Sequence, residues 1–105
     1  MNITHDPVLK KLRTELDEYY GSRLERVVLF GSRARGGERQ DSDYDVEVFL
    51  RSSASFWEES GHLAEIGTDI LYETGAVTNA LPFQADAYHE LTPLMHEIRR
   101  EGIEV

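Results

Sequence analysis

The sequence predicts a small α/β (α+β) domain in which a mixed β-sheet has helices packed on one face. Three observations lead to this fold class. Segments with the apolar spacing of amphipathic helices alternate along the chain with short runs rich in β-branched and aromatic residues. The turns between them are short, and the sequence contains no internal repeat, low-complexity tract or linker. Since 105 residues suit one domain, we expect residues 1–105 to fold as a single unit.

Three helices are predicted, and each ends at a glycine. The first covers residues 7–20, because Asp6 followed by proline is a capping signal for the helix that begins there. The second covers residues 55–74, where apolar residues recur at helical spacing. The third begins at Thr92-Pro93, another cap followed by proline, and stops at Gly102.

Strands are predicted over residues 26–30, 43–50 and 77–83, with a final edge strand over residues 103–105. Residues 43–50 alternate, so this strand is expected to be half buried, with one apolar face toward a helix. The apolar face carries Tyr44, Val46, Val48 and Leu50, and the other face carries Asp43, Asp45, Glu47 and Phe49.

Asp43 and Asp45 are the candidate catalytic residues. They lie two residues apart on a predicted strand, so both side chains leave the same face. Two carboxylates side by side repel each other, and a divalent cation removes that cost. Two carboxylates suit Mg²⁺, which takes water and substrate phosphate oxygens as its other ligands. The pair is therefore predicted to bind Mg²⁺ and to serve phosphoryl or nucleotidyl transfer.

A glycine- and arginine-rich segment follows the strand predicted at 26–30. Gly31 lets backbone N–H groups approach a phosphate, and the hydroxyl of Ser32 adds a donor. Arg33, Arg35 and Arg39 place three of the 11 basic residues in this one loop. Arginine is suited to phosphate oxygens, so Gly31, Ser32, Arg33 and Arg35 are predicted to bind a nucleotide.

Gly31-Ser32 together with Ser42-Asp43-Tyr44-Asp45 resembles the G-S…D-x-D signature of the polymerase-beta-type nucleotidyltransferase superfamily. The small size resembles the minimal nucleotidyltransferase (MNT) family within it, and the resemblance covers most of the chain. It implies a polymerase-beta-like fold, a triphosphate held by Gly-Ser, Mg²⁺ held by the two aspartates, and transfer of NMP from an NTP to a hydroxyl. Many MNT proteins are antitoxins encoded with a HEPN-domain toxin, and some add AMP to a tyrosine of that toxin. The resemblance therefore implies an antitoxin that uses ATP or another NTP and has a HEPN-type partner.

The superfamily places a third carboxylate on the strand that follows the middle helix, and residues 77–83 contain no acid. Asn79 is the nearest polar residue there, although an amide is a poor base and a weak metal ligand. Glu47 is the other candidate for the third position, since it lies on the strand face of Asp45, roughly 7 Å further along.

Charge and composition limit the partners. The chain has 20 acidic and 11 basic residues, a formal net charge of −9, which disfavours general nucleic-acid binding and suits a basic protein partner. Residues 52–98 contain eight acids, among them Glu58 and Glu59, and no lysine or arginine. These acids are expected to form either a solvated surface or a docking surface for a basic protein. The protein is expected to act within an oligomer or a hetero-complex. Trp57, the single tryptophan, is expected to lie in the core, and exposure toward a partner is the alternative for Phe56 and Trp57.

The absence of cysteine excludes disulfides, thiol catalysis and zinc–thiolate sites. No apolar run approaches the roughly 18 residues of a membrane helix, and the N-terminus has no signal-peptide pattern, so we expect a cytoplasmic protein.

Two alternative functions stay open at this point. One is a catalytically weak or inactive antitoxin that neutralises its toxin by binding. The other is a small-molecule nucleotidyltransferase, for which 105 residues leave little room for an acceptor-binding domain.

Overall fold

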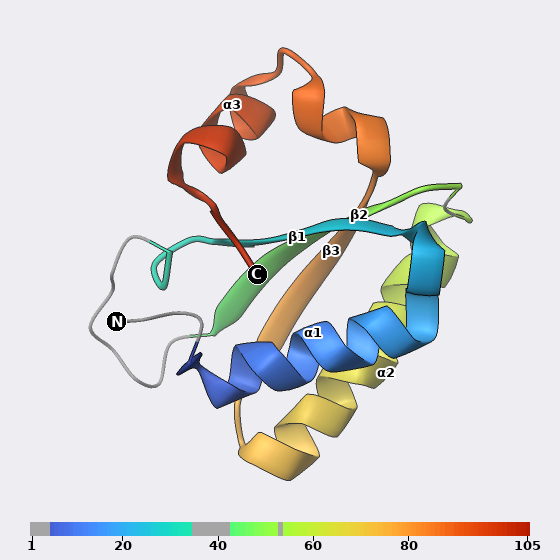
Figure 1. Ribbon diagram of the computed structural model, residues 1–105, viewed down its shortest axis with the longest axis vertical. Helices are drawn as coiled ribbons and strands as arrows, with labels where there is room; N and C mark the ends of the chain where they lie inside the picture. The colour runs from blue at the N-terminus through green and yellow to red at the C-terminus, as the bar shows by residue number, and fades with distance from the viewer. Residues whose placement is uncertain (1–4, 35–42, 53) are drawn as a thin grey trace.

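The computed structural model describes residues 5–34, 43–52 and 54–105, and shows helices and strands in alternation (Figure 1). Each of the predicted helices and strands is present, with bounds shifted by at most two residues. The short 3-10 helices over residues 21–23 and 85–89 were not predicted. The elements in order are α1 (Pro7–Tyr20), η2 (Gly21–Arg23), β1 (Leu24–Phe30), β2 (Tyr44–Leu50), α2 (Phe56–Thr74), β3 (Thr78–Gln84), η3 (Ala85–His89), α3 (Pro93–Glu101) and β4 (Ile103–Glu104).

The strands form one mixed sheet in the order β3-β2-β1-β4. β1 is antiparallel to both β2 and β4, whereas β2 and β3 are parallel and are connected through α2. Pro82 is compatible with β3 because β3 is an edge strand, where a missing N–H donor costs no ladder hydrogen bond. The predicted mixed α/β fold is therefore confirmed.

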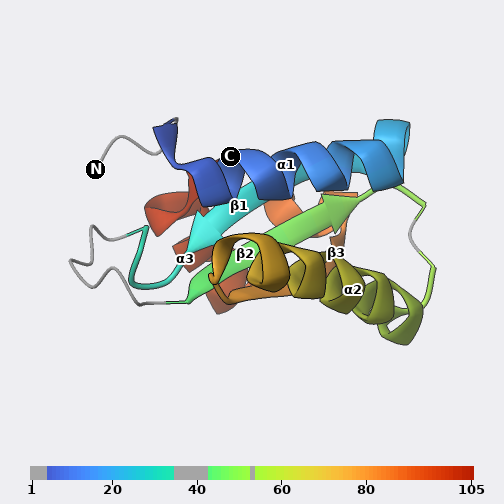
Figure 2. The same ribbon diagram turned by 90° about the horizontal axis from the view of Figure 1, so that it is seen from below.

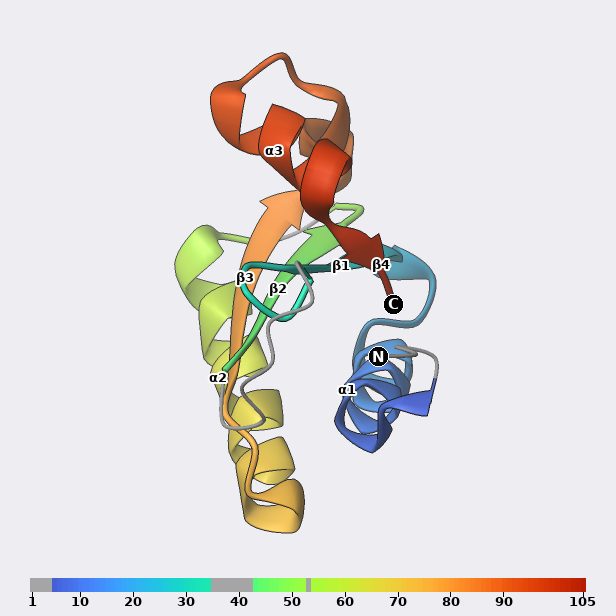
Figure 3. The same ribbon diagram turned by 90° about the vertical axis from the view of Figure 1, so that its left-hand side faces the viewer.

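Helices α1 and α2 cover one face of the sheet, and α3 lies beyond the other face (Figures 2 and 3). The main core lies under α1 and α2 and contains the apolar face of β2, as the alternation predicted. A second, smaller core joins Val28 and Phe49 to Ala87 in η3 and to Met95 and Ile98 in α3. The expectation of helices on one face therefore describes α1 and α2 but not α3.

β2 is more buried than the predicted half-buried strand. Phe49 on the face opposite α1 and α2 is fully buried, since η3 and α3 cover that end of the sheet. The other end of this face, near Asp45, is only partly covered. Asp45 and Glu47 on this face thus line a pocket together with Leu94 of α3, whereas Asp43 is exposed.

Asp6 connects the start of α1 to β2. Its Oδ1 accepts hydrogen bonds from the backbone N–H groups of Val8 (2.8 Å) and Leu9 (3.2 Å), as expected of a helix cap. Its Oδ2 accepts a hydrogen bond of 2.8 Å from the hydroxyl of Tyr44. Since Tyr44 stands between the two candidate aspartates in the sequence, this bond fixes the start of β2 against the helical layer.

Trp57 does not lie in the core, because 81% of its surface is exposed. It is at the first turn of α2, with its ring edge-on to that of Phe56, which is half exposed.

Among the helices that the structure describes, none combines the length and apolar character needed to cross a bilayer.

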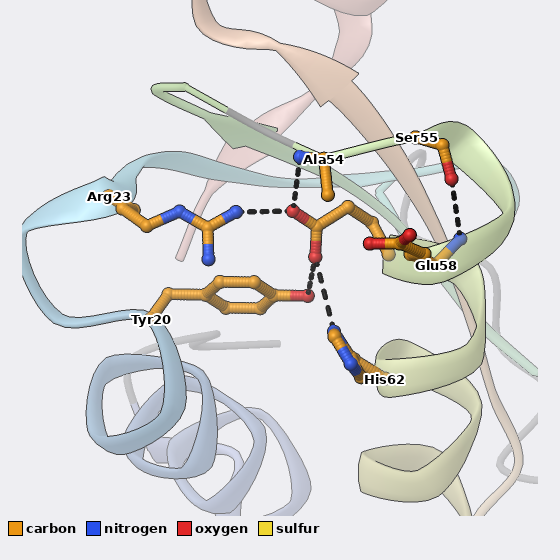
Figure 4. Close-up of polar contacts among 7 residues, drawn as sticks. Tyr20, Arg23, Ala54, Ser55, Glu58 and His62 are labelled. Atoms are coloured by element: carbon orange, nitrogen blue, oxygen red, sulfur yellow. Dashed lines mark hydrogen bonds and ion pairs between the residues drawn. The ribbon is translucent and has the colours of Figure 1, made fainter.

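Glu59 is not part of an acidic surface, since it is 1% exposed. Figure 4 shows Tyr20, Arg23 and His62 directed at one carboxylate. Glu59 Oε2 pairs with the guanidinium of Arg23 and accepts the backbone N–H of Ala54 (3.0 Å), while Oε1 accepts the hydroxyl of Tyr20 (3.3 Å) and lies 3.3 Å from His62 Nδ1. Burial alone would raise the pKa of Glu59, but these hydrogen bonds and the arginine charge outweigh it and lower the pKa.

We predict that Glu59→Ala lowers the free energy of unfolding by about 3 kcal/mol, because it leaves buried donors without an acceptor. The neighbouring Glu58 is exposed, so Glu58→Ala is the control and costs less than about 1 kcal/mol. Denaturant unfolding at pH 7 measures both.

The pH dependence has a defined sign. The lowered pKa means that Glu59 stabilises the fold above the ordinary glutamate value of 4.5, and that this contribution is lost as the pH falls below it. The difference in the free energy of unfolding between the wild type and Glu59→Ala should therefore decrease as the pH falls below this value. Equal losses in the free energy of unfolding for Glu59→Ala and Glu58→Ala at pH 7 would show that the contacts of Glu59 do not stabilise the fold.

Candidate functional site

The start of β2 and the end of β1 bring the predicted site residues together. In the antiparallel pairing of these strands, Phe30 lies opposite Asp45. Gly31 directly follows Phe30, so the glycine segment begins beside the aspartate strand. The backbone N–H of Tyr44 also donates to the carbonyl of Val77 (2.9 Å), which fixes β3 at the same end of the sheet.

Position 31 requires a glycine because of both its backbone conformation and its surroundings. Its φ is +78°, in the left-handed region that residues with a side chain rarely adopt. A Cβ atom added at this position would lie 2.8 Å from Asp45 Oδ2. The backbone of the glycine segment therefore approaches the carboxylate as closely as a residue without a side chain allows.

Asn79 lies between the two aspartates. The parallel pairing of β2 and β3 places Asn79 opposite Asp45. Its Nδ2 donates hydrogen bonds to Asp43 Oδ2 (3.0 Å) and Asp45 Oδ1 (3.3 Å). Asn79, one of the two candidates for the third position, thus contacts both carboxylates, and its amide donors offset the repulsion between them.

Glu47, the other candidate for the third position, is on the same strand face but deeper in the protein. It is 5% exposed, and its Oε1 has no hydrogen-bond partner. Burial, followed by the negative charge of Asp45, raises the pKa of Glu47 to about 7. Its neighbourhood is that of a buried acid rather than of an exposed metal ligand.

The predicted phosphate-binding residues are only partly described. Ser32 and Arg33 lie in the turn after β1. The guanidinium of Arg33 stacks 3.8 Å above the ring of Tyr44, whose side chain leaves β2 on the face opposite the aspartates. Arg33 is therefore placed beside the site rather than between the carboxylates. Arg35 lies outside the described residues.

The donor set fits a hard divalent cation. Asp43 is exposed and Asp45 is partly exposed, so both carboxylates are accessible from solvent. In the described part of the chain, no group of three or more His, Cys, Asp or Glu side chains is placed to hold a metal ion. Two carboxylates with an adjacent amide suit an ion that takes its other ligands from phosphate oxygens and water.

The glycine turn therefore lies beside a carboxylate pair on the neighbouring strand. The nucleotidyltransferase domain family matches residues 9–92. The chain belongs to this family. It is a nucleotidyltransferase, as the Gly-Ser and Asp-x-Asp residues predicted.

Two curated relatives come from Methanocaldococcus jannaschii. "Putative protein adenylyltransferase MJ0604" is 25% identical over 79 residues, which cover 75% of this chain and 73% of the relative. "Putative protein adenylyltransferase MJ0141" is 31% identical over 52 residues, and this match covers 50% of the chain and 52% of the relative.

Solved structures share the nucleotidyltransferase fold. A toxin–antitoxin crystal structure with AMP-PNP has a TM-score of 0.60 at 16% identity, covering 90% of this chain and 70% of the other. A structure of a "putative minimal nucleotidyltransferase" has a TM-score of 0.56 at 25% identity, covering 97% of this chain and 99% of the other. The resemblance to minimal nucleotidyltransferases is thereby confirmed.

The apolar side of the site was not predicted from the sequence. Leu81 and Phe83 of β3, with Phe30 of β1 and Leu94 of α3, line a pocket next to Asp45. The alternation of residues 79, 81 and 83 along one strand face was a signal that could have found part of this lining. The contribution of α3 had no such signal, because it depends on where the last helix packs.

Gly31→Ala is predicted to lower nucleotidyl transfer by about 10- to 100-fold, because the added methyl displaces the Asp45 carboxylate. Gly75→Ala is a matched control, since Gly75 has a φ of +77° and open space around its missing side chain. Both substitutions carry a similar backbone strain of about 1–2 kcal/mol. Thermal unfolding should report a similar loss for both, and equal activity losses would contradict the close-approach role of Gly31.

Proposed function

We propose that this nucleotidyltransferase is an antitoxin that transfers AMP from ATP to a hydroxyl of a partner toxin, with a tyrosine of a HEPN-type protein as the acceptor. The observation that carries the proposal is the Asp43–Asn79–Asp45 cluster beside Gly31. Support also comes from the relatives named as protein adenylyltransferases and from the toxin–antitoxin complexes that share the fold.

The residues have distinct roles in this proposal. Asp43 and Asp45 hold Mg²⁺, which when bound neutralises phosphate charge. Backbone N–H groups at Gly31 and Ser32 bind the triphosphate oxygens, and the hydroxyl of Ser32 adds a donor. Arg33 adds positive charge from its place over Tyr44, and Arg35 is assigned the same role from the sequence.

The reaction is an in-line displacement at the α-phosphorus. The acceptor oxygen forms a bond to the α-phosphorus, the bond from that phosphorus to the bridging oxygen of the β-phosphate breaks, and pyrophosphate leaves. The acceptor hydroxyl loses its proton to solvent water during attack. A tyrosine hydroxyl, with an ordinary pKa of about 10, needs less help from a base than an aliphatic hydroxyl does. A phenolic acceptor is therefore consistent with an amide at Asn79 in place of a third carboxylate.

The surface is compatible with a basic protein partner. With Glu59 buried, exposed acids such as Glu58, Glu65 and Asp69 stay on α2. Large exposed apolar side chains, including Trp57 and Tyr72 on the same helix, accompany them. Acidic groups of this kind steer a basic partner toward the enzyme, and exposed aromatic residues are common at protein interfaces. We place the reaction in the cytoplasm, where nucleoside triphosphates are supplied.

We expect incubation with labelled ATP, Mg²⁺ and the toxin encoded next to this protein to add the mass of one or more AMP units to the toxin. Intact-mass spectrometry and peptide mapping would read the product. Asp43→Asn and Asp45→Asn should abolish the gain, whereas Asp86→Asn, an exposed aspartate in η3, should not. A stable complex without any mass change would instead support neutralisation by binding.

Asn79→Asp is predicted to destabilise the protein in EDTA, because three carboxylates then meet without the amide donors. Mg²⁺ should restore stability and raise the melting temperature of this variant more than that of the wild type. Asn79→Ala is the control, since it removes the amide without adding charge. Equal Mg²⁺ shifts in the two variants would show that position 79 does not face the metal.

A further inference from the structure

A pocket of about 410 Å³ opens next to the aspartate pair on the α3 side of the sheet. Its walls are mostly apolar and come from three elements. Phe30 ends β1, Leu81 and Phe83 belong to β3, and Leu94 is in the first turn of α3. Asp45 and Asn79 also line it, so the pocket is continuous with the carboxylate cluster. Nothing in the proposed phosphate chemistry requires this apolar space.

Glu47 is the buried polar residue of this pocket. It lines the pocket, yet it is 5% exposed and its Oε1 has no hydrogen-bond partner. This is unlike the two other buried carboxylates of the described chain. Asp6 accepts three hydrogen bonds, and Glu59 is paired with an arginine and further donors.

A buried carboxyl oxygen without a hydrogen-bond partner is costly, and a ligand that supplies an N–H donor to it recovers part of that cost. The terminal torsion of a glutamate side chain is broad and roughly two-fold, so rotation about it can present either oxygen of Glu47 to the pocket. The pocket therefore favours an apolar, flat ligand group with a hydrogen-bond donor at its inner edge.

Two flat groups take part in the proposed reaction, the nucleobase and the acceptor phenol. The phenol oxygen has to reach the α-phosphorus at Asp43 and Asp45, so its ring would turn an apolar end toward Glu47. A nucleobase is joined to the α-phosphorus through the ribose, and its exocyclic amine projects from its far edge. Glu47 lies roughly 7 Å beyond Asp45 along β2, a distance that the ribose and base can span.

We propose that this pocket holds the adenine base of ATP and that Glu47 accepts a hydrogen bond from its exocyclic amino group, which makes Glu47 a specificity-determining residue. The assignment rests on the proposed function for the phosphate site. The hydrogen bond to Glu47 would make binding selective for adenine, because recognition of the triphosphate does not distinguish one nucleoside triphosphate from another. Leu81, Phe83 and Leu94 would pack against the faces and edge of the base.

The test compares ATP with purine riboside 5′-triphosphate, which lacks the 6-amino group, in Mg²⁺-dependent binding measured by isothermal titration calorimetry. The wild type should bind ATP about ten-fold or more tightly than the analogue, the size expected for a hydrogen bond to a carboxylate. Glu47→Leu should bind the two nucleotides within about two-fold of each other, since it removes the acceptor and keeps the pocket apolar. Glu47→Gln keeps an acceptor oxygen and should keep a preference for ATP.

Glu18→Leu is the matched control, because Glu18 is exposed on α1 and stands apart from the pocket lining. It should keep the full preference for ATP. Thermal unfolding confirms that each variant is folded, and the wild-type comparison of the two nucleotides requires no variant at all.

Inorganic tripolyphosphate separates this proposal from the proposed function. Equal wild-type affinity for ATP and the analogue, with tripolyphosphate binding lost in Asp45→Asn, would overturn the base pocket and leave the phosphate site intact. An undiminished preference for ATP in Glu47→Leu would also overturn it. No Mg²⁺-dependent binding of any of the three probes would overturn both proposals together.

Discussion

The two-residue period of β2 is the constraint on which the rest of the structure depends. Alternate side chains of this strand point to opposite faces of the sheet, so one segment of seven residues supplies both core and chemistry. Tyr44 and Val46 enter the core under α1 and α2, while Asp45 and Glu47 face the site. A register shift of one residue would exchange the two sets and place carboxylates in the main core, which makes the register strongly determined.

The neighbours of β2 complete the site by backbone pairing rather than by contact between side chains alone. Antiparallel pairing with β1 places the end of that strand, and hence Gly31, at Asp45. Parallel pairing with β3, through the α2 crossover, places Asn79 opposite Asp45. Since the end of β1 and the starts of β2 and β3 lie at the same end of the sheet, the glycine turn, the carboxylate pair and Asn79 meet there.

Buried carboxyl groups have different roles at different ends of this small sheet. Asp6 caps α1 and accepts the hydroxyl of Tyr44, and Glu59 joins the start of α2 to η2 and the end of α1. Both carboxylates accept several hydrogen bonds, which offset the free-energy cost of burying a charge. Oε1 of Glu47 has no hydrogen-bond partner, and Glu47 lines a pocket next to Asp45. The contrast separates structural acids from one that is available to a ligand.

The sequence by itself determined the order of helices and strands, the aspartate pair and the glycine turn, because capping residues, apolar periodicity and short motifs act over a few neighbouring residues. Tertiary structure alone decided the rest. Glu59 belongs to an acidic stretch in the sequence, and it is buried only because Arg23 and Tyr20 come from elements remote in the chain. Likewise, α3 covers the face opposite α1 and α2 and brings Leu94 to the site, a placement that depends on long-range packing and that local patterns do not encode.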